Sequence, residues 1–418
     1  MGRLLRLALL VSLLGGCDAA GLPDGPALVV PPVYPGGEAG LKTSEGEPER
    51  GAALPARAYS LPAPARALGA FGGELAAGTE AGLLVRGADG FVSPRVFGAG
   101  GEPASTGEIR LLAQRGQGAL LAHTANGLFH ERDGVLLRSP LSATVAELAI
   151  ERLDAFGEGE AEELWLVCAD RLLRVAGGKL QEISVSGVSG RVELAVAIAR
   201  DTALLLAGGE LFRVELAAGK APRLAKNLGR GLASARGPDG SAYLGTDAGL
   251  LVVPPDGGLR RITFAAAGAP PASVVALAAR AGRVVAALPD AVVEVADGTS
   301  RVLAELAGVR LLTFDGYGAT WVVNGSGLFR LPTDEAISFE RHVKPFMQAH
   351  CTSCHASGAL GAPRVDLTDY ATVKAADTII LKRIRADGTP PMPPASVEVL
   401  SAADIALIGR WVEGGSKP

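Results

Sequence analysis

The segment GSAYLGTDAGLLVV, residues 240–253, holds two short apolar stretches on either side of a turn. The first stretch ends near Leu244 and the second begins at Leu250. Two strands joined in this way need a tight turn, in which Gly or Asp supplies positive φ angles that other residues avoid. The segment therefore predicts a β-hairpin built from a short apolar strand, a turn and a second alternating strand.

The same pattern occurs seven times between residues 61 and 332. The first apolar residues after the turns are Leu83, Leu128, Leu172, Leu211, Leu250, Val292 and Leu328. The step averages about 41 residues, close to the period of a propeller blade of four short strands. A single blade cannot bury both of its faces, whereas blades stacked around a central channel can. We therefore expect an all-β seven-bladed propeller over residues 61–332, with eight blades or a β-sandwich as alternatives.

The turn sequences resemble a known kind of repeat. The form GT-x-x-GL, at residues 78–83 and 245–250, and the form NGSGLFRL, at 324–331, are similar to propeller repeats of two-component-regulator sensor proteins. This resemblance implies the propeller fold and says almost nothing about function.

Composition narrows the functional classes. Of the 418 residues 48% are hydrophobic and 20% are charged, which allows a sizeable core and excludes wholesale disorder. The formal net charge is −4 and no long basic run is present, so we expect no nucleic-acid partner. The four cysteines are unevenly spaced and do not form a disulfide framework.

The amino-terminal residues 1–16 have the features of a secretory signal peptide. Arg3 and Arg6 precede an apolar run from Leu7 to Leu14, which is shorter than the ~20 residues that a transmembrane helix needs. The sequence Leu-Gly-Gly-Cys at 14–17 resembles a bacterial lipobox, which implies lipidation of Cys17 as the mature amino terminus. The alternative is an ordinary signal peptide with an incidental cysteine. Lipidation would anchor an extracytoplasmic protein to a bacterial membrane, either inner or outer.

Residues 17–60 are rich in Pro, Gly, Ala and Glu and lack sustained periodicity. We expect the lipidated cysteine to be followed by a flexible linker over this range.

Residues 333–418 form a region of different character, with apolar residues at helical spacing. Pro345 suits the first turn of a helix that runs toward Cys351 and Cys354. Ile405, Ile408 and Val412 lie on one stripe of a second helix near the carboxyl end. A small all-α domain is therefore expected to follow the propeller.

The sequence Cys351-Thr352-Ser353-Cys354-His355 is the C-x-x-C-H signature of covalent haem c attachment. One helical turn separates the sulfurs so that both can form thioethers with one porphyrin, and the next residue, His355, becomes the axial iron ligand. A zinc site, a thioredoxin-like redox pair and a structural disulfide are the alternatives. A zinc site would need two further ligands at matching spacing. A thioredoxin-like pair would need a β-α-β context, and a disulfide between cysteines at this spacing would be strained.

Met392 is the candidate for the sixth iron ligand. It lies in GTPPMPPAS, 388–396, where the flanking prolines restrict the backbone. The 37 residues after His355 are long enough to pass around a porphyrin and return on its other face. The alternative is a core methionine that fills a gap, whereas Met347 is badly placed because it lies one turn before Cys351.

This carboxyl-terminal segment resembles the mono-haem class I cytochrome c family. The matching positions are Phe339, Val343, Pro345, Cys351, Cys354, His355, Met392, Pro393, Pro394 and Trp411. The resemblance covers about 85 residues. It implies one haem c per chain, His–Met ligation of the iron by His355 and Met392, one-electron transfer, and crossing of the first and last helices. Lys382, Arg383 and Arg385 would then form a solvated helix face, or pair with propionates or a partner.

We therefore expect a membrane-tethered electron-transfer protein that uses the propeller as a scaffold or as a docking surface for redox partner proteins. Two other functions remain open. One is a propeller oxidoreductase that passes electrons to its own cytochrome domain, and the other is a haem-based redox or gas sensor. Of the remaining candidates, Cys168 is expected to be a buried small hydrophobe, and His123 and His130 are expected at the surface or in turns.

Overall fold

The computed structural model describes residues 28–30, 32–33, 41–46, 48 and 56–418. Within the last range it omits 88–89, 116–118, 147, 158–161, 170, 187–189, 257, 266–269, 281–282, 297–298, 317, 326, 332–336, 359–364, 387–389, 395–399, 401 and 414. The predicted signal peptide and Cys17 lie outside the described residues.

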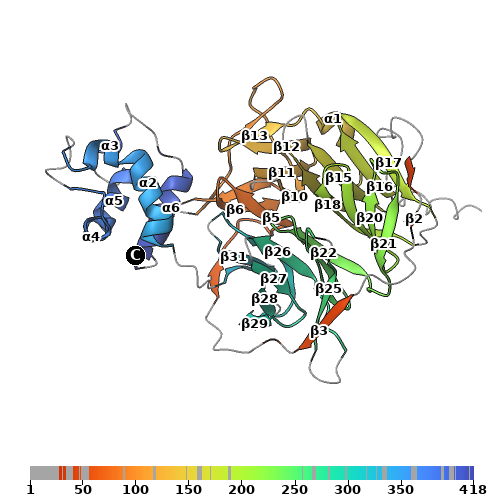
Figure 1. The fold of residues 1–418 in the computed structure, drawn as a ribbon. Helices are drawn as coiled ribbons and strands as arrows, with labels where there is room; N and C mark the ends of the chain where they lie inside the picture. Colours follow the sequence, from red (N-terminus) through yellow and green to blue (C-terminus); the bar gives the residue numbers. More distant parts are fainter. Residues whose placement is uncertain are drawn as a thin grey trace, which may run out of the picture.

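The described strands form seven sheets arranged as a propeller (Figure 1), which confirms the predicted fold of the repeat region. Blade 1 contains β5 (67–71), β6 (74–79), β7 (82–86) and β8 (91–92). Blade 2 contains β9 (96–97), β10 (109–115), β11 (119–124), β12 (127–132) and β13 (135–138). A short helix, α1 (Ser142–Val145), follows blade 2.

The next three blades each have four consecutive strands and a fifth strand from the amino-terminal region. Blade 3 contains β14 (152–156), β15 (163–168), β16 (171–176), β17 (179–185) and β1 (28–30). Blade 4 contains β18 (192–199), β19 (202–207), β20 (210–215), β21 (221–225) and β2 (32–33). Blade 5 contains β22 (231–236), β23 (242–246), β24 (249–253), β25 (260–264) and β3 (42–46).

The last two blades have four strands. Blade 6 contains β26 (276–280), β27 (283–287), β28 (292–296) and β29 (299–304). Blade 7 contains β30 (309–314), β31 (320–324), β32 (327–330) and β4 (57–59). Each innermost strand contacts the innermost strand of the next blade, and β30 of blade 7 contacts β5 of blade 1. The ring is therefore closed.

Hydrogen bonds of the Thr hydroxyl explain why the Thr-x-x-Gly turn recurs. In the turn between β23 and β24, the Thr246 hydroxyl donates to the Gly249 carbonyl oxygen at 3.1 Å and accepts from the Ala248 N–H at 3.1 Å. Thr79 makes the same two bonds in blade 1, and Thr124 makes them in blade 2. Gly249 has φ +119°, where a Cβ atom would lie 2.4 Å from the Ile262 carbonyl oxygen.

Gly249→Ala is therefore expected to destabilise the protein by about 2 kcal/mol, because the Cβ meets backbone and the residue must keep a positive φ. Gly134→Ala is the matched control: Gly134 also has a positive φ, +70°, but a Cβ atom there would have nothing within 4 Å. It should cost only about 1 kcal/mol. Urea unfolding measures both, and equal losses would contradict the proposed clash.

The structure differs from the expected flexible linker over residues 17–60. Strands β1, β2 and β3 pair in parallel with the outer strands β17, β21 and β25 of blades 3, 4 and 5. Strand β4 pairs antiparallel with β32 and supplies the outer strand of blade 7, so the propeller begins before residue 61. The Pro-rich composition concealed these strands because each is short and lies at a sheet edge, where proline is tolerated.

Helices follow the propeller in the carboxyl-terminal region. They are the π-helical turn η2 (Phe339–Val343), α2 (Lys344–His350), α3 (Thr352–His355), α4 (Tyr370–Ala375), α5 (Asp377–Ile384) and α6 (Ala402–Glu413). Pro345 lies in the first turn of α2, as predicted. A cluster of buried residues from this region alone includes Phe339, Val343, Phe346, Ile408 and Trp411. No helix in the described part of the chain has the length and apolarity needed to cross a bilayer.

Candidate functional site

Cys351 joins α2 to α3, and Cys354 and His355 are the last two residues of the single-turn helix α3. The Cys351 N–H donates to the Met347 carbonyl oxygen at 2.9 Å. The N–H groups of Cys354 and His355 donate to the Cys351 carbonyl oxygen at 3.2 and 3.0 Å. Cys351 is buried and Cys354 is exposed, and neither is in a disulfide with a described residue. The local hydrogen bonds therefore fix the spacing of two thiols and one imidazole.

The imidazole of His355 is held by the segment that precedes α4. Its Nδ1 lies 3.1 Å from the Val365 carbonyl oxygen, and the His355 carbonyl oxygen accepts from the Leu367 N–H at 2.8 Å. A carbonyl oxygen can only accept, so we assign the proton of the neutral ring to Nδ1. This leaves the Nε2 lone pair available to a metal, and the half-buried ring is fixed in orientation.

Met392 comes from a separate segment that is held against α5. Its N–H donates to the Arg383 carbonyl oxygen at 3.2 Å, and the Arg383 guanidinium donates to the Pro390 carbonyl oxygen at 3.3 Å. The Met392 side chain is 42% exposed and lies outside the buried cluster that contains Cys351. Large apolar side chains this exposed are rare in the described residues; the others are Val92 and Ile379. Met392 is therefore anchored through its backbone, and the residue is not packed in the core.

The second methionine of this region behaves differently. Met347 is 1% exposed and belongs to the same buried cluster as Cys351. It packs in the core from α2, so it is a structural methionine and a natural control for Met392.

The basic residues of α5 and its end differ in exposure. Lys382 is exposed, whereas Arg383 and Arg385 are half-buried. Arg385 Nε is buried without a hydrogen-bond partner among the described residues. The expectation of a uniformly solvated basic face is thus met by Lys382 only.

No group of three or more His, Cys, Asp or Glu side chains able to hold a metal ion occurs among the residues that the structure describes. The haem predicted from the sequence would not need such a group, because a haem iron is carried by the porphyrin and would take one protein ligand from each face.

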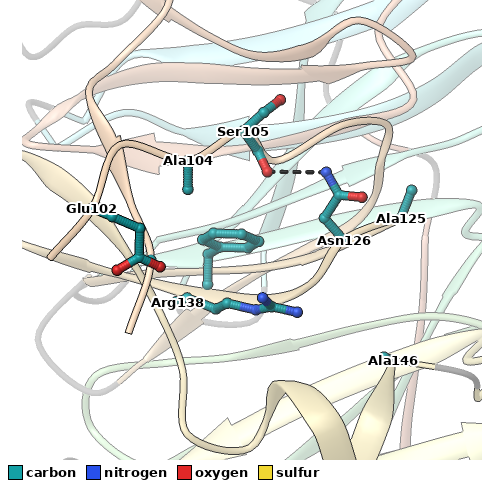
Figure 2. Close-up of a pocket in the computed structure, with 9 residues that line it drawn as sticks. Glu102, Ala104, Ser105, Ala125, Asn126, Arg138 and Ala146 are labelled. Carbon is teal, nitrogen blue, oxygen red and sulfur yellow. Dashed lines mark hydrogen bonds between the residues drawn. The ribbon is translucent and has the colours of Figure 1, made fainter. Parts of the chain in front are cut away.

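A separate hollow of about 390 Å³ lies on the propeller at blade 2 (Figure 2). Glu102, Asn126, Phe129 and Arg138 are among its lining residues, and the Asn126 amide donates to the Ser105 carbonyl oxygen at 3.0 Å. Its polar side chains are exposed and carry opposite charges. None of the residues predicted to bind haem lines this hollow.

Two further expectations concern propeller residues. Cys168 in β15 is fully buried, as predicted. The surface placement of His123 is wrong, because His123 lies in β11 and is fully buried. Burial, together with the nearby Arg110 charge, lowers the pKa of His123 to about 4. The alternation of β11 gave no sign of this, because both faces of a central blade strand are covered by neighbouring blades.

No protein-family profile matches the chain, and no curated protein matches it in sequence. Solved structures do resemble it. The structure of U3-55K matches with a TM-score of 0.48 at 12% identity, covering 66% of this chain and 98% of the other. An inactive virginiamycin B lyase from Staphylococcus aureus with quinupristin gives 0.47 at 12% identity, covering 67% and 99%. The extracellular domain of a B. thetaiotaomicron protein described as a hybrid two-component system gives 0.47 at 14% identity, covering 66% and 39%.

Proposed function

We propose that this chain is an extracytoplasmic, lipid-anchored c-type cytochrome that transfers single electrons. Cys351 and Cys354 would bind one haem c covalently, and His355 and Met392 would be its axial ligands. The propeller would act as a scaffold or as a docking surface for redox partner proteins. The observation that carries the proposal is the turn at 351–355, where two thiols and an imidazole with an available Nε2 share one rigid backbone segment.

The residues present fit a haem. The chemistry of the donor set is appropriate, since thiols form thioethers and imidazole and thioether ligands suit haem iron. Met392 is 42% exposed, and a bound porphyrin would cover its apolar side chain. Cys354 is exposed and therefore accessible for attachment. Haem supplies reversible one-electron chemistry, and methionine ligation favours the reduced state.

The protein's own contribution would be orientation. The Val365 carbonyl oxygen holds the His355 ring through Nδ1 and makes the imidazole a stronger donor. The Arg383 carbonyl oxygen holds the Met392 backbone. With both axial positions taken, no position would remain for a substrate, so electron transfer is favoured over catalysis.

The first test is spectroscopic, on full-length protein matured in a host that attaches haem c. The oxidised protein should show a near-infrared methionine charge-transfer band, which Met392→Ala abolishes. Met347→Leu is the control and should keep the band, because Met347 is a core residue. A band that survives in Met392→Ala would refute the ligand assignment.

The second test concerns attachment. Wild-type protein should keep its haem after acid–acetone extraction and gain the mass of one haem. The double variant Cys351→Ser, Cys354→Ser should release its haem under the same treatment, and Cys168→Ser should behave as wild type. Colourless, unmodified wild-type protein would defeat the proposed function.

A further inference from the structure

We propose that the outer rim of blade 3 faces the lipid bilayer, and that the carboxyl-terminal helices are held on the opposite side of the propeller. This inference rests on the lipid anchor at Cys17 in the proposed function. It further predicts the class of redox partner: a water-soluble protein that meets the helices away from the bilayer.

The amino-terminal strands define where the chain reaches the propeller. Leu28 pairs with Ile183 and Val30 with Val185, so β1 lies on the outer edge of blade 3. The following strands β2 and β3 lie on blades 4 and 5, and β4 lies on blade 7. The segment thus enters at blade 3 and passes around the rim toward blade 7.

Little chain is left between the anchor and this entry point. Cys17 and Leu28 are 11 residues apart. A fully extended chain of that length spans at most about 37 Å, and a flexible one has an r.m.s. span of about 18 Å. A propeller of this size has a radius of gyration of about 19 Å and hence a width of about 50 Å. The tether is therefore shorter than the width of the body it holds, so the rim at blade 3 must stay near the membrane.

The carboxyl-terminal helices leave from the other side of the ring. They begin at Phe339, only nine residues after β32 of blade 7 ends at Arg330, and a chain of that length reaches at most about 32 Å. Blades 3 and 7 are three places apart by the shorter route in a ring of seven, which is as far as two blades can be. Figure 1 shows the helices at one edge of the propeller and β17 and β2 at the other.

The consequence concerns electron transfer. A haem in these helices would lie roughly a propeller width from the lipid surface. An integral membrane partner with its redox centre near that surface would be too far away for contact. A soluble partner can approach the helices directly, so this distance does not limit it.

The test measures the distance of each rim from lipid by energy transfer. Lys179 and Thr299 are the first residues of β17 and β29, the fourth consecutive strands of blades 3 and 6, and both are exposed. Lys179→Cys and Thr299→Cys each give one donor position, since Cys168 is buried and the haem cysteines are consumed by thioethers. The holoprotein is lipidated, incorporated in phosphatidylcholine vesicles, and compared with and without acceptor-labelled lipid.

The donor lifetime at position 179 should fall at least about threefold on adding acceptor lipid, and that at position 299 should change little. A matched protein with a ~100-residue Gly/Ser insertion after Ala20 should lose this difference, because the r.m.s. span of its tether, about 58 Å, exceeds the propeller width. Equal quenching at both positions in protein that floats with the vesicles would overturn the orientation alone. Protein that fails to float would instead overturn the lipid anchor, and with it this inference.

Discussion

Trp321→Ala is expected to destabilise the propeller by about 3–5 kcal/mol, the usual range for a buried aromatic side chain. Trp321 is fully buried in β31 and packs with Leu75 and Ala77 of blade 1, so it lies where the last blade meets the first. Its ring centroid is 4.9 Å from that of Tyr59 in the closing strand β4. The indole N–H donates to Asp315 Oδ2 at 2.9 Å. Urea or thermal unfolding of the holoprotein measures the loss.

The second tryptophan of the propeller separates packing from hydrogen bonding. Trp165 is equally buried, but its indole N–H has no hydrogen-bond partner among the described residues. Trp321→Phe should cost about 1–3 kcal/mol, because it leaves the buried Asp315 carboxylate without one donor. Trp165→Phe removes an unpaired N–H and should cost clearly less. Equal costs for the two phenylalanine variants would show that the Asp315 bond contributes nothing.

Lowering the pH from 7 to 4 is expected to remove about 3 kcal/mol of stability through His123 alone. The pKa of His123 is 6.5 when unperturbed and about 4 in the folded protein. Burial disfavours the charged form of the ring, and neither ring nitrogen makes a regular hydrogen bond within the described residues. The nearby Val145 backbone raises the pKa, but by less than burial lowers it. Between these two pKa values the unfolded chain binds more protons than the folded one. The contribution is therefore complete above pH 6.5 and declines until about pH 4.

His123→Leu should flatten this decline in a series of urea-unfolding midpoints between pH 4 and pH 7. The control is His130→Gln. Burial also lowers the pKa of His130, but its side chain is only half-buried, so most of the wild-type pH dependence should remain. A His123→Leu protein with the wild-type profile would show that other groups cause the acid sensitivity.

The propeller could be predicted because its signal is repeated. Seven similar turns recur at a mean step of about 41 residues. Residues such as Thr246 and Gly249 also have a hydrogen-bonding and φ requirement that the sequence displays directly. The strands β1 to β4 could not be predicted, because two to five residues in a Pro-rich segment have no periodicity. Their pairing depends on outer blade edges that exist only after folding.

The candidate site was predictable to different degrees. The turn at 351–355 is contiguous in sequence, so its residues come together by local hydrogen bonds. The Val365 carbonyl oxygen that orients His355 could not have been predicted, since any residue type offers a carbonyl oxygen. Likewise, the burial of His123 depends on packing between blades, which a single strand sequence does not reveal.

The strand Arg57–Tyr59 also has a consequence for biosynthesis. Tyr59 pairs with Leu328, 269 residues later, and bringing the ends of so long a loop together costs about 5 kcal/mol. A ribosome or export channel delivers the chain from its amino end. Strand β4 therefore cannot pair with β32, and the ring cannot close, until the seventh blade has emerged. A product that terminates before residue 327 lacks β32 and therefore the β4–β32 pairing that closes the ring. Proteases should degrade such a product even when its first six blades have folded.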